Sequence, residues 1–222
     1  MRLHSALALL ALGAALPACA RAQQPARPPA AADSAAGARA GDDPTTPEGE
    51  LLPAGLGSLS RDEISVRLRD EQLEVSFTPL DERVLRLLAP DTYTALRGLV
   101  TARRPAVDSV GQRYGISNPG LAVVSFFGRR EDARFDPELV SVTARGRILR
   151  PVGILPMGAA FSSQQLGLRG QANALYVFDE LLPVDDQMQV SYGVLSTFDW
   201  ERRLPAFERE RARIAARSRA PR

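Results

Sequence analysis

Large apolar residues alternate with polar ones in two neighbouring segments, residues 64–68 and residues 73–77. An alternation with a period of two is typical of a β-strand that buries one face. The polar residues 69–72 between the two segments suit a short turn. The pattern therefore predicts a β-hairpin.

A helical spacing of apolar residues follows this hairpin. After Pro90, the residues expected on one buried face are Tyr93, Leu96, Leu99 and Val100. Asp91 is expected to cap this helix, and Pro105 to end or kink it, because proline lacks a backbone N–H. A further helical segment ends at Gly115, and its inward residues are Val107, Val110 and Tyr114. We predict a hairpin with helices over residues 59–116.

From residue 117 onward the chain shows the period of β-strands again. Short segments rich in apolar and aromatic residues are separated by turns that contain proline or glycine. These segments are residues 121–127, 140–143, 148–155, 174–178 and 188–192. Short strands at this spacing predict an antiparallel β-sandwich over residues 117–195.

The last part of the chain has the pattern of an amphipathic helix. Apolar residues recur near helical spacing at Trp200, Leu204, Phe207 and Ile214. Ser196 and Asp199 fit a capping box at its start, and Pro205 is expected to kink the helix or to mark its true beginning. We predict a C-terminal helix over residues 196–219, whose apolar stripe docks on the domain.

One motif within the predicted sandwich has counterparts in other proteins. The residues that carry it are Phe135-Asp136-Pro137, then Val140, Val142 and Gly146, and then Tyr176-Val177-Phe178. In this order they resemble the small immunoglobulin-like sandwiches of uncharacterised bacterial exported proteins. The resemblance implies a fold class of α+β: an antiparallel immunoglobulin-like β-sandwich, preceded by a β-hairpin with helices and followed by a helix. A shared fold does not imply a function.

The N-terminus has the features of a signal peptide for export. Arg2 precedes an uncharged, mostly apolar stretch, residues 5–16, which is shorter than the roughly 18 residues of a membrane-spanning helix. Leu16-Pro17-Ala18-Cys19 resembles the lipobox of bacterial lipoproteins, which implies a lipidated Cys19 after a signal peptide of residues 1–18. Ala20-Arg21-Ala22 is an alternative A-x-A site, which ends the signal peptide at residue 22 and releases a soluble chain.

The segment after the signal peptide, residues 19–58, is rich in alanine, proline, glycine and aspartate. It has almost no large apolar residue before Leu51. Such a segment buries too little surface to offset the entropy of ordering it. We interpret it as a disordered tether between a lipid anchor and the folded part.

The composition excludes much of enzyme chemistry. All 28 basic residues are arginine, His4 is the only histidine, and Cys19 is the only cysteine. Removal of the signal peptide and lipidation of the thiol leave no imidazole, lysine amine or free thiol. Nucleophilic triads, Schiff-base lysines and metal sites built on histidine or cysteine are therefore excluded. We predict no catalytic residue, no cofactor and no metal site.

Carboxylates are the remaining candidates for chemistry. The candidates are Asp179-Glu180, Asp185-Asp186, and the spaced pair Asp132 and Asp136. Such side chains bind calcium or act as the acid and base of a glycosidase when they converge, although carboxylates in loops are usually only solvated. Gly55-Leu56-Gly57 is a weak signal for phosphate binding, because no strand precedes it and no lysine follows.

Charge is distributed unevenly along the chain. Residues 201–222 contain eight arginines and three glutamates, a net charge of +5, and residues 23–200 carry a net charge of −5. Arginine binds the phosphates of lipids and lipopolysaccharide. Pairs at i, i+3, Glu208 with Arg211 and Glu210 with Arg213, favour a solvated helix face instead. Nucleic acid is not an expected partner, because the protein is exported and its body is acidic.

These observations favour a non-enzymatic cell-envelope protein, lipid-anchored in the outer membrane or periplasm, that binds or braces an envelope protein or glycan. The membrane contact is the lipid on Cys19. Two alternatives remain open from the sequence. One is a soluble periplasmic or secreted binding module with the same fold, and the other is a carboxylate-dependent glycan hydrolase.

Overall fold

The computed structural model describes residues 51–219, which belong to one compact unit. The predicted signal peptide, Cys19 and residues 19–50 of the predicted tether lie outside the described residues. Within residues 51–219, no helix is both long and apolar enough to cross a membrane.

Five antiparallel strands form the larger sheet. In sheet order they are β1 (Val66–Arg69), β2 (Leu73–Pro79), β3 (Gly120–Gly128), β9 (Gln171–Phe178) and β7 (Pro151–Pro156). The predicted hairpin is confirmed, because β1 pairs with β2 and Val66 lies opposite Phe77. β2 pairs along its whole length with β3. The segments 59–116 and 117–195 therefore share one sheet.

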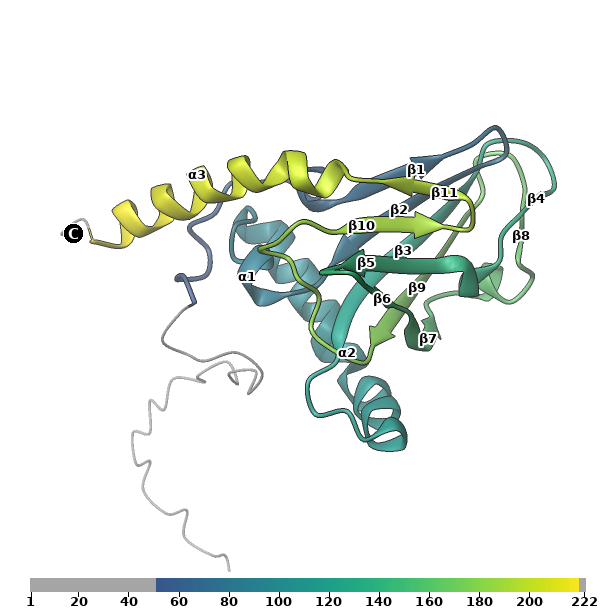
Figure 1. The fold of residues 1–222 in the computed structure, drawn as a ribbon, viewed down its shortest axis with the longest axis horizontal. Coiled ribbons are helices and arrows are strands. Elements are labelled where there is room, and N and C mark those ends of the chain that lie inside the picture. Colours follow the sequence, from purple (N-terminus) through teal and green to yellow (C-terminus); the bar gives the residue numbers. More distant parts are fainter. Residues whose placement is uncertain (1–50, 220–222) are drawn as a thin grey trace, which may run out of the picture. The chain divides into compact units, whose positions relative to one another are not determined.

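Four antiparallel strands form the smaller sheet. In sheet order they are β11 (Leu195–Thr197), β10 (Gln189–Tyr192), β5 (Val140–Ala144) and β6 (Arg147–Leu149). Only Arg150 separates β6 from β7, so the chain passes directly from one sheet to the other, and β11 lies beside β1 at the other edge (Figure 1). A two-stranded sheet pairs β4 (Ala133–Arg134) with β8 (Gln165–Leu166). The predicted α+β sandwich of antiparallel sheets is confirmed.

An aromatic cluster fills the core. Phe126 stacks on Phe135 with ring centroids 4.4 Å apart, and Tyr192 meets Phe126 edge on. The motif that starts at Phe135 is held by two tyrosine hydroxyls. The Tyr176 hydroxyl donates to the carbonyl oxygen of Pro137 (2.8 Å), and the Tyr192 hydroxyl accepts from the backbone N–H of Asp136 (2.9 Å). Burial raises the pKa of both phenols.

The long helix α2 (Pro90–Tyr114) runs through Pro105. Pro105 and Thr101, whose carbonyl loses its helical partner, are both exposed, so water can replace the missing bond. The predicted cap at Asp91 is wrong: Ala89 is the N-cap, because proline is favourable at the first helical position. The helix ends at Gly115 with φ 68°, as predicted.

The side of α2 that faces the core is the predicted one, with one exception. Leu96 and Val107 are buried, and Tyr93, Leu99, Val100 and Val110 pack against the core. Tyr114 is 54% exposed, contrary to the prediction, because it lies in the last turn of the helix. The remaining short helices are η1 (Arg61–Ile64), α1 (Glu82–Leu85), η2 (Pro137–Leu139) and η3 (Ala159–Phe161).

The C-terminal helix α3 (Asp199–Arg219) docks as predicted. Trp200, Phe207 and Ile214 are fully buried. The rings of Trp200 and Phe207 lie 5.1 Å apart, and the indole N–H donates to the carbonyl oxygen of Val184 (3.2 Å). Arg203 donates to the carbonyl oxygens of Asp62 and Glu63 at the end of η1 (2.8 and 2.7 Å).

The start of α3 differs from the prediction. Ser196 belongs to β11 and pairs with Ser191, so the predicted capping box is wrong. The hydroxyl of Thr197 accepts from the backbone N–H of Asp199 instead (3.1 Å). Pro205 lies inside the helix. The sequence does not predict β11, because its three residues form a strand only by pairing with β10.

The last part of the predicted tether, residues 51–58, packs on the folded body. Leu52 and Leu56 contact the core. The backbone N–H of Ser58 donates to Oε1 of Glu210 (2.8 Å), a residue of α3 that is buried. Gly57 lies so close to the backbone of Leu87 that an added Cβ would be 2.3 Å from it. The folded body therefore begins before the predicted end of the tether at residue 58.

Candidate functional site

The adjacent carboxylates Asp185 and Asp186 do not act as a pair. Asp185 forms ion pairs with Arg83 and Arg211, which lie in α1 and α3. Asp186 is paired with Arg145 of the β5–β6 turn, whose Nε lies 2.9 Å from its Oδ2. Each carboxylate therefore holds a different part of the fold. This arrangement does not place an acid and a base on either side of one bond.

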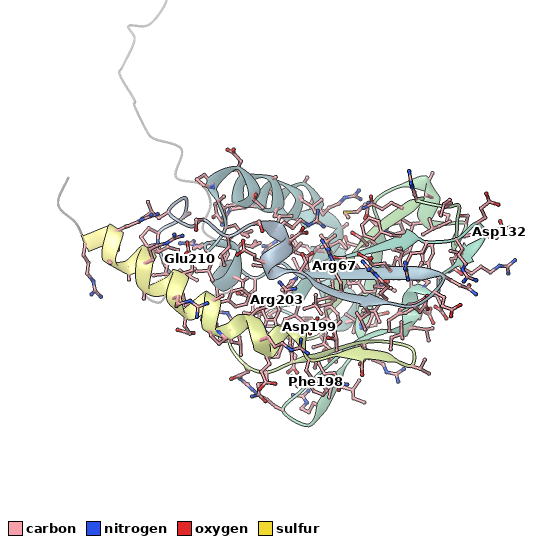
Figure 2. The ribbon with its side chains drawn as sticks, turned by 90° about the horizontal axis from the view of Figure 1, so that it is seen from above. Arg67, Asp132, Phe198, Asp199, Arg203 and Glu210 are labelled. Atoms are coloured by element: carbon pink, nitrogen blue, oxygen red, sulfur yellow. The ribbon has the colours of Figure 1, made fainter. Side chains whose placement is uncertain are left out.

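Three of the other four candidate carboxylates have separate partners, and Asp179 is exposed. Glu180 pairs with Arg147 (3.1 Å), the Asp132 carboxylate accepts from the Gln165 amide (2.8 Å), and Asp136 caps η2. Asp132 lies at an end of the body far from Glu210 and α3 (Figure 2). In the part of the chain from 51 to 219, no three histidine, cysteine, aspartate or glutamate side chains are grouped for a metal ion.

The glycines of the motif Gly55-Leu56-Gly57 have structural roles. Gly55 adopts φ 82°, a left-handed conformation that residues with a Cβ rarely take. Gly57 allows the chain to run against the backbone of Leu87, and Leu59 then donates its N–H to the Leu87 carbonyl (3.0 Å). Close backbone packing explains this motif without a phosphate ligand.

A groove of about 680 Å³ lies between α1, α3 and the segment at Leu51. Its charged residues are already paired. Arg83 binds Asp81 with Nε 2.9 Å from Oδ1, and Arg86 binds Glu82 (2.8 Å). The hydrogen bond with Asp81 raises the pKa of the Arg83 guanidinium against the opposing effect of burial. We interpret this groove as the seam that holds α3 on the body.

A second groove, at the end of the smaller sheet, has a different character. It measures about 450 Å³ and is lined by Thr143, Ala144, Arg145, Gly146, Asp186, Gln187, Met188, Gln189 and Phe198. We call it the sheet-end groove. Phe198 is 56% exposed and projects from the edge of the ribbon just before α3 (Figure 2).

The register of the smaller sheet presents the polar residues of this groove. Gln189 lies opposite Thr143, and Thr143 lies opposite Ile148. The neighbours of these residues along the strands, Val190, Val142 and Leu149, are buried. Because successive side chains of a strand point to opposite faces, the amide of Gln189 and the hydroxyl of Thr143 lie on the outer face.

One ion pair and one hydrogen bond join the walls of the sheet-end groove. Arg145 and Gly146 form the β5–β6 turn with positive φ values of 51° and 75°, as in a tight hairpin turn. Arg145 pairs with Asp186, and the Gln187 amide donates to the Glu201 carboxylate of α3 (2.8 Å). The turn, the β9–β10 connection and α3 are therefore tied together around the groove.

This arrangement suits binding. A site that recognises a small ligand combines apolar or aromatic surface with a few fixed polar groups. Here Phe198 supplies an exposed ring, Thr143 and Gln189 supply a hydroxyl and an amide, and Asp186, whose Oδ2 is paired with Arg145, supplies its other carboxylate oxygen as an acceptor. A ligand with many hydroxyl groups and one apolar face fits this set. Its hydroxyl groups can form hydrogen bonds with the polar side chains, and its apolar face can pack on the ring of Phe198.

The sequence singled out one residue of this groove, Asp186, and missed the others. Phe198 falls in the predicted helix over residues 196–219, where no local pattern indicates that it is exposed. The alternation in residues 188–192 is the signal that could have indicated the site. Its apolar positions predict a strand, and its polar positions, which include Gln189, belong to the opposite face of that strand.

Comparisons of the chain with protein-family models, with curated proteins and with solved structures found no match.

Proposed function

We propose that this protein is a non-enzymatic binding module of the bacterial cell envelope, anchored through a lipid on Cys19, which binds an envelope glycan in the sheet-end groove. The observation that carries the proposal is the exposed ring of Phe198 in one groove with the polar side chains of Thr143, Gln189 and Asp186. Sugars offer hydroxyl groups to the polar side chains and C–H faces to the ring.

Envelope location is supported by the signal-like N-terminus and the lipobox-like motif before Cys19. The test is the intact mass of the mature protein from its native membrane fraction. We expect the mass of an acylated chain that starts at Cys19. A mass that starts at Gln23 would remove the anchor from the proposal and leave a soluble module.

A binding role is favoured over glycan hydrolysis by the partners of the carboxylates. Asp185 and Asp186 are each paired with arginine, and in the described part of the chain they serve different elements. A glycosidase instead needs two carboxyl groups held on either side of one bond. The purified protein is therefore expected to leave envelope glycans intact.

The groove is tested by substitution of its aromatic residue. We expect Phe198→Ala to weaken binding of soluble envelope glycan fragments at least about tenfold, the loss of ~1.4 kcal/mol of contact. Val194→Ala is the matched control, because Val194 is fully exposed (101%) in the β10–β11 turn and does not line the groove. Titration by NMR or calorimetry measures both variants. Equal affinities of Phe198→Ala and the parent protein would exclude this groove as the ligand site.

A further inference from the structure

Four arginines of α3 lie on one face of the helix. Arg202, Arg209, Arg213 and Arg217 are separated by seven, four and four residues. With about 3.6 residues per turn, these separations return to the same side of a helix. All four residues are exposed. We call this set the arginine stripe.

The acidic residues of α3 neutralise only part of the arginine stripe: Arg202 pairs with Asp199 (3.3 Å) and Arg213 with Glu210. Glu201 and Glu208 lie on a different side of the helix, as their spacing from Arg209 shows. Glu210 is buried and is shared by Arg213 and the backbone of Ser58. Arg209 forms no ion pair with any residue between 51 and 219. The stripe is a local positive surface on a chain that is formally neutral from Gln23 onward.

The arginine stripe is next to the segment through which the chain joins the body. Arg213 donates to the Ser58 hydroxyl, and Arg217 donates to the carbonyl oxygen of Leu56 (3.2 Å). Residues 51–58 are the described residues nearest to Cys19 in the sequence. Leu51, at the start of this segment, lies instead in the groove with Glu208 and Arg211, so the segment passes from that groove to the stripe.

We infer that the arginine stripe docks the body on a bilayer surface that contains anionic phospholipids. Guanidinium groups form paired hydrogen bonds with phosphate oxygens and are weakly hydrated, so they suit a lipid headgroup region. The alanines between the arginines, Ala206 and Ala216, leave the guanidinium groups as the most extended part of this face. Docking would orient the sheet-end groove relative to the membrane. It goes beyond the proposed glycan binding and does not require the lipid on Cys19.

The test uses the chain that starts at Gln23, which has no acyl group, and sedimentation with vesicles. The parent protein is expected to bind vesicles of phosphatidylglycerol and phosphatidylethanolamine, and to bind phosphatidylcholine vesicles much less. Each arginine near an anionic surface contributes about fivefold to the partition coefficient. The double variant Arg202→Gln, Arg209→Gln should therefore bind about 30-fold more weakly.

The control is Arg134→Gln with Arg150→Gln, which changes the net charge equally at exposed positions outside α3. This control should retain most of the binding. Equal losses in the two double variants would overturn the inference, as would equal binding to neutral and anionic vesicles. Binding to polyglutamate or single-stranded DNA without vesicle binding would also overturn it, in favour of an acidic macromolecule. The intact-mass test of Cys19 is independent of all these outcomes.

Discussion

At the scale of single residues, backbone contacts decide which glycines the fold requires. An added Cβ at Gly57 would lie 2.3 Å from the backbone of Leu87, whereas at Gly98, inside α2, it would meet nothing within 4 Å. We expect Gly57→Ala to lower the free energy of unfolding by about 1–3 kcal/mol through overpacking. Gly98→Ala should raise it by about 0.5–1 kcal/mol, because alanine favours a helix.

Urea unfolding of the two variants measures both changes. We expect the two changes in the free energy of unfolding to have opposite signs. A neutral Gly57→Ala would mean that residues 51–58 leave the body at little cost, and would contradict the packing described for this segment.

The buried tyrosines predict how stability changes in alkali. Burial raises the pKa of Tyr176 and Tyr192 above that of an unfolded tyrosine, about 10. The stability due to the neutral phenols is therefore complete below about pH 10 and is lost as the pH rises further, since the unfolded state ionises first. Tyr176 should contribute up to about 1.4 kcal/mol per pH unit to this loss.

Tyr176→Phe should reduce this slope, measured by urea unfolding between about pH 10 and 12. The exposed Tyr114 provides the control, and Tyr114→Phe should leave the slope unchanged. An unchanged slope in Tyr176→Phe would show that Tyr176 ionises as easily in the folded protein as in the unfolded chain.

At the scale of elements, α3 depends on its first turn. Trp200 is fully buried, contacts the tilted ring of Phe207 and donates a hydrogen bond to the carbonyl oxygen of Val184. We expect Trp200→Ala to destabilise the protein by about 3–5 kcal/mol, the usual cost of removing a buried aromatic side chain. Ser218→Ala, on an exposed position of the same helix, should change stability by less than about 0.5 kcal/mol. Thermal or urea unfolding compares the two, and similar small effects would mean that α3 is not part of the cooperative unit.

The elements that the sequence predicted well are those with a strong period. The alternation in residues 64–68 and 73–77 was sufficient for the hairpin, since one buried face is enough to specify it. The three-residue strand β11 was missed because so short a segment has no period of its own and becomes a strand only by pairing with β10. Ser196 and Asp199 favour a helix cap locally, but the pairing of Ser196 with Ser191 places Ser196 in the sheet.

At the scale of the whole molecule, residues 51–58 connect the folded body to the part of the chain that precedes it. A chain that starts at Leu59 loses the Ser58 N–H and hydroxyl that donate to Glu210 (2.8 and 3.2 Å). Because Glu210 is buried, we expect this chain to be about 1–3 kcal/mol less stable than one that starts at Leu51. Equal unfolding midpoints for the two chains would show that the segment adds no stability.

The candidate site was less predictable than the fold. Asp186 was singled out as a carboxylate, but Phe198, Gln189 and Thr143 were not, because none belongs to a motif with a known chemistry. Their proximity depends on the pairing of β10 with β5 and on where α3 begins. Neither is a local property of the sequence.

The sequence by itself determined a composition with no lysine, one histidine and one cysteine, the hairpin, and the apolar stripe of α3. These are local or compositional properties, and each depends on residues a few positions apart. Only the tertiary structure decided that one sheet joins residues 66–79 to residues 120–178, that Glu210 holds Ser58, and that Phe198 opens onto a groove with Asp186. Such contacts join distant parts of the chain, and their free energy depends on burial and strand pairing that no single segment contains.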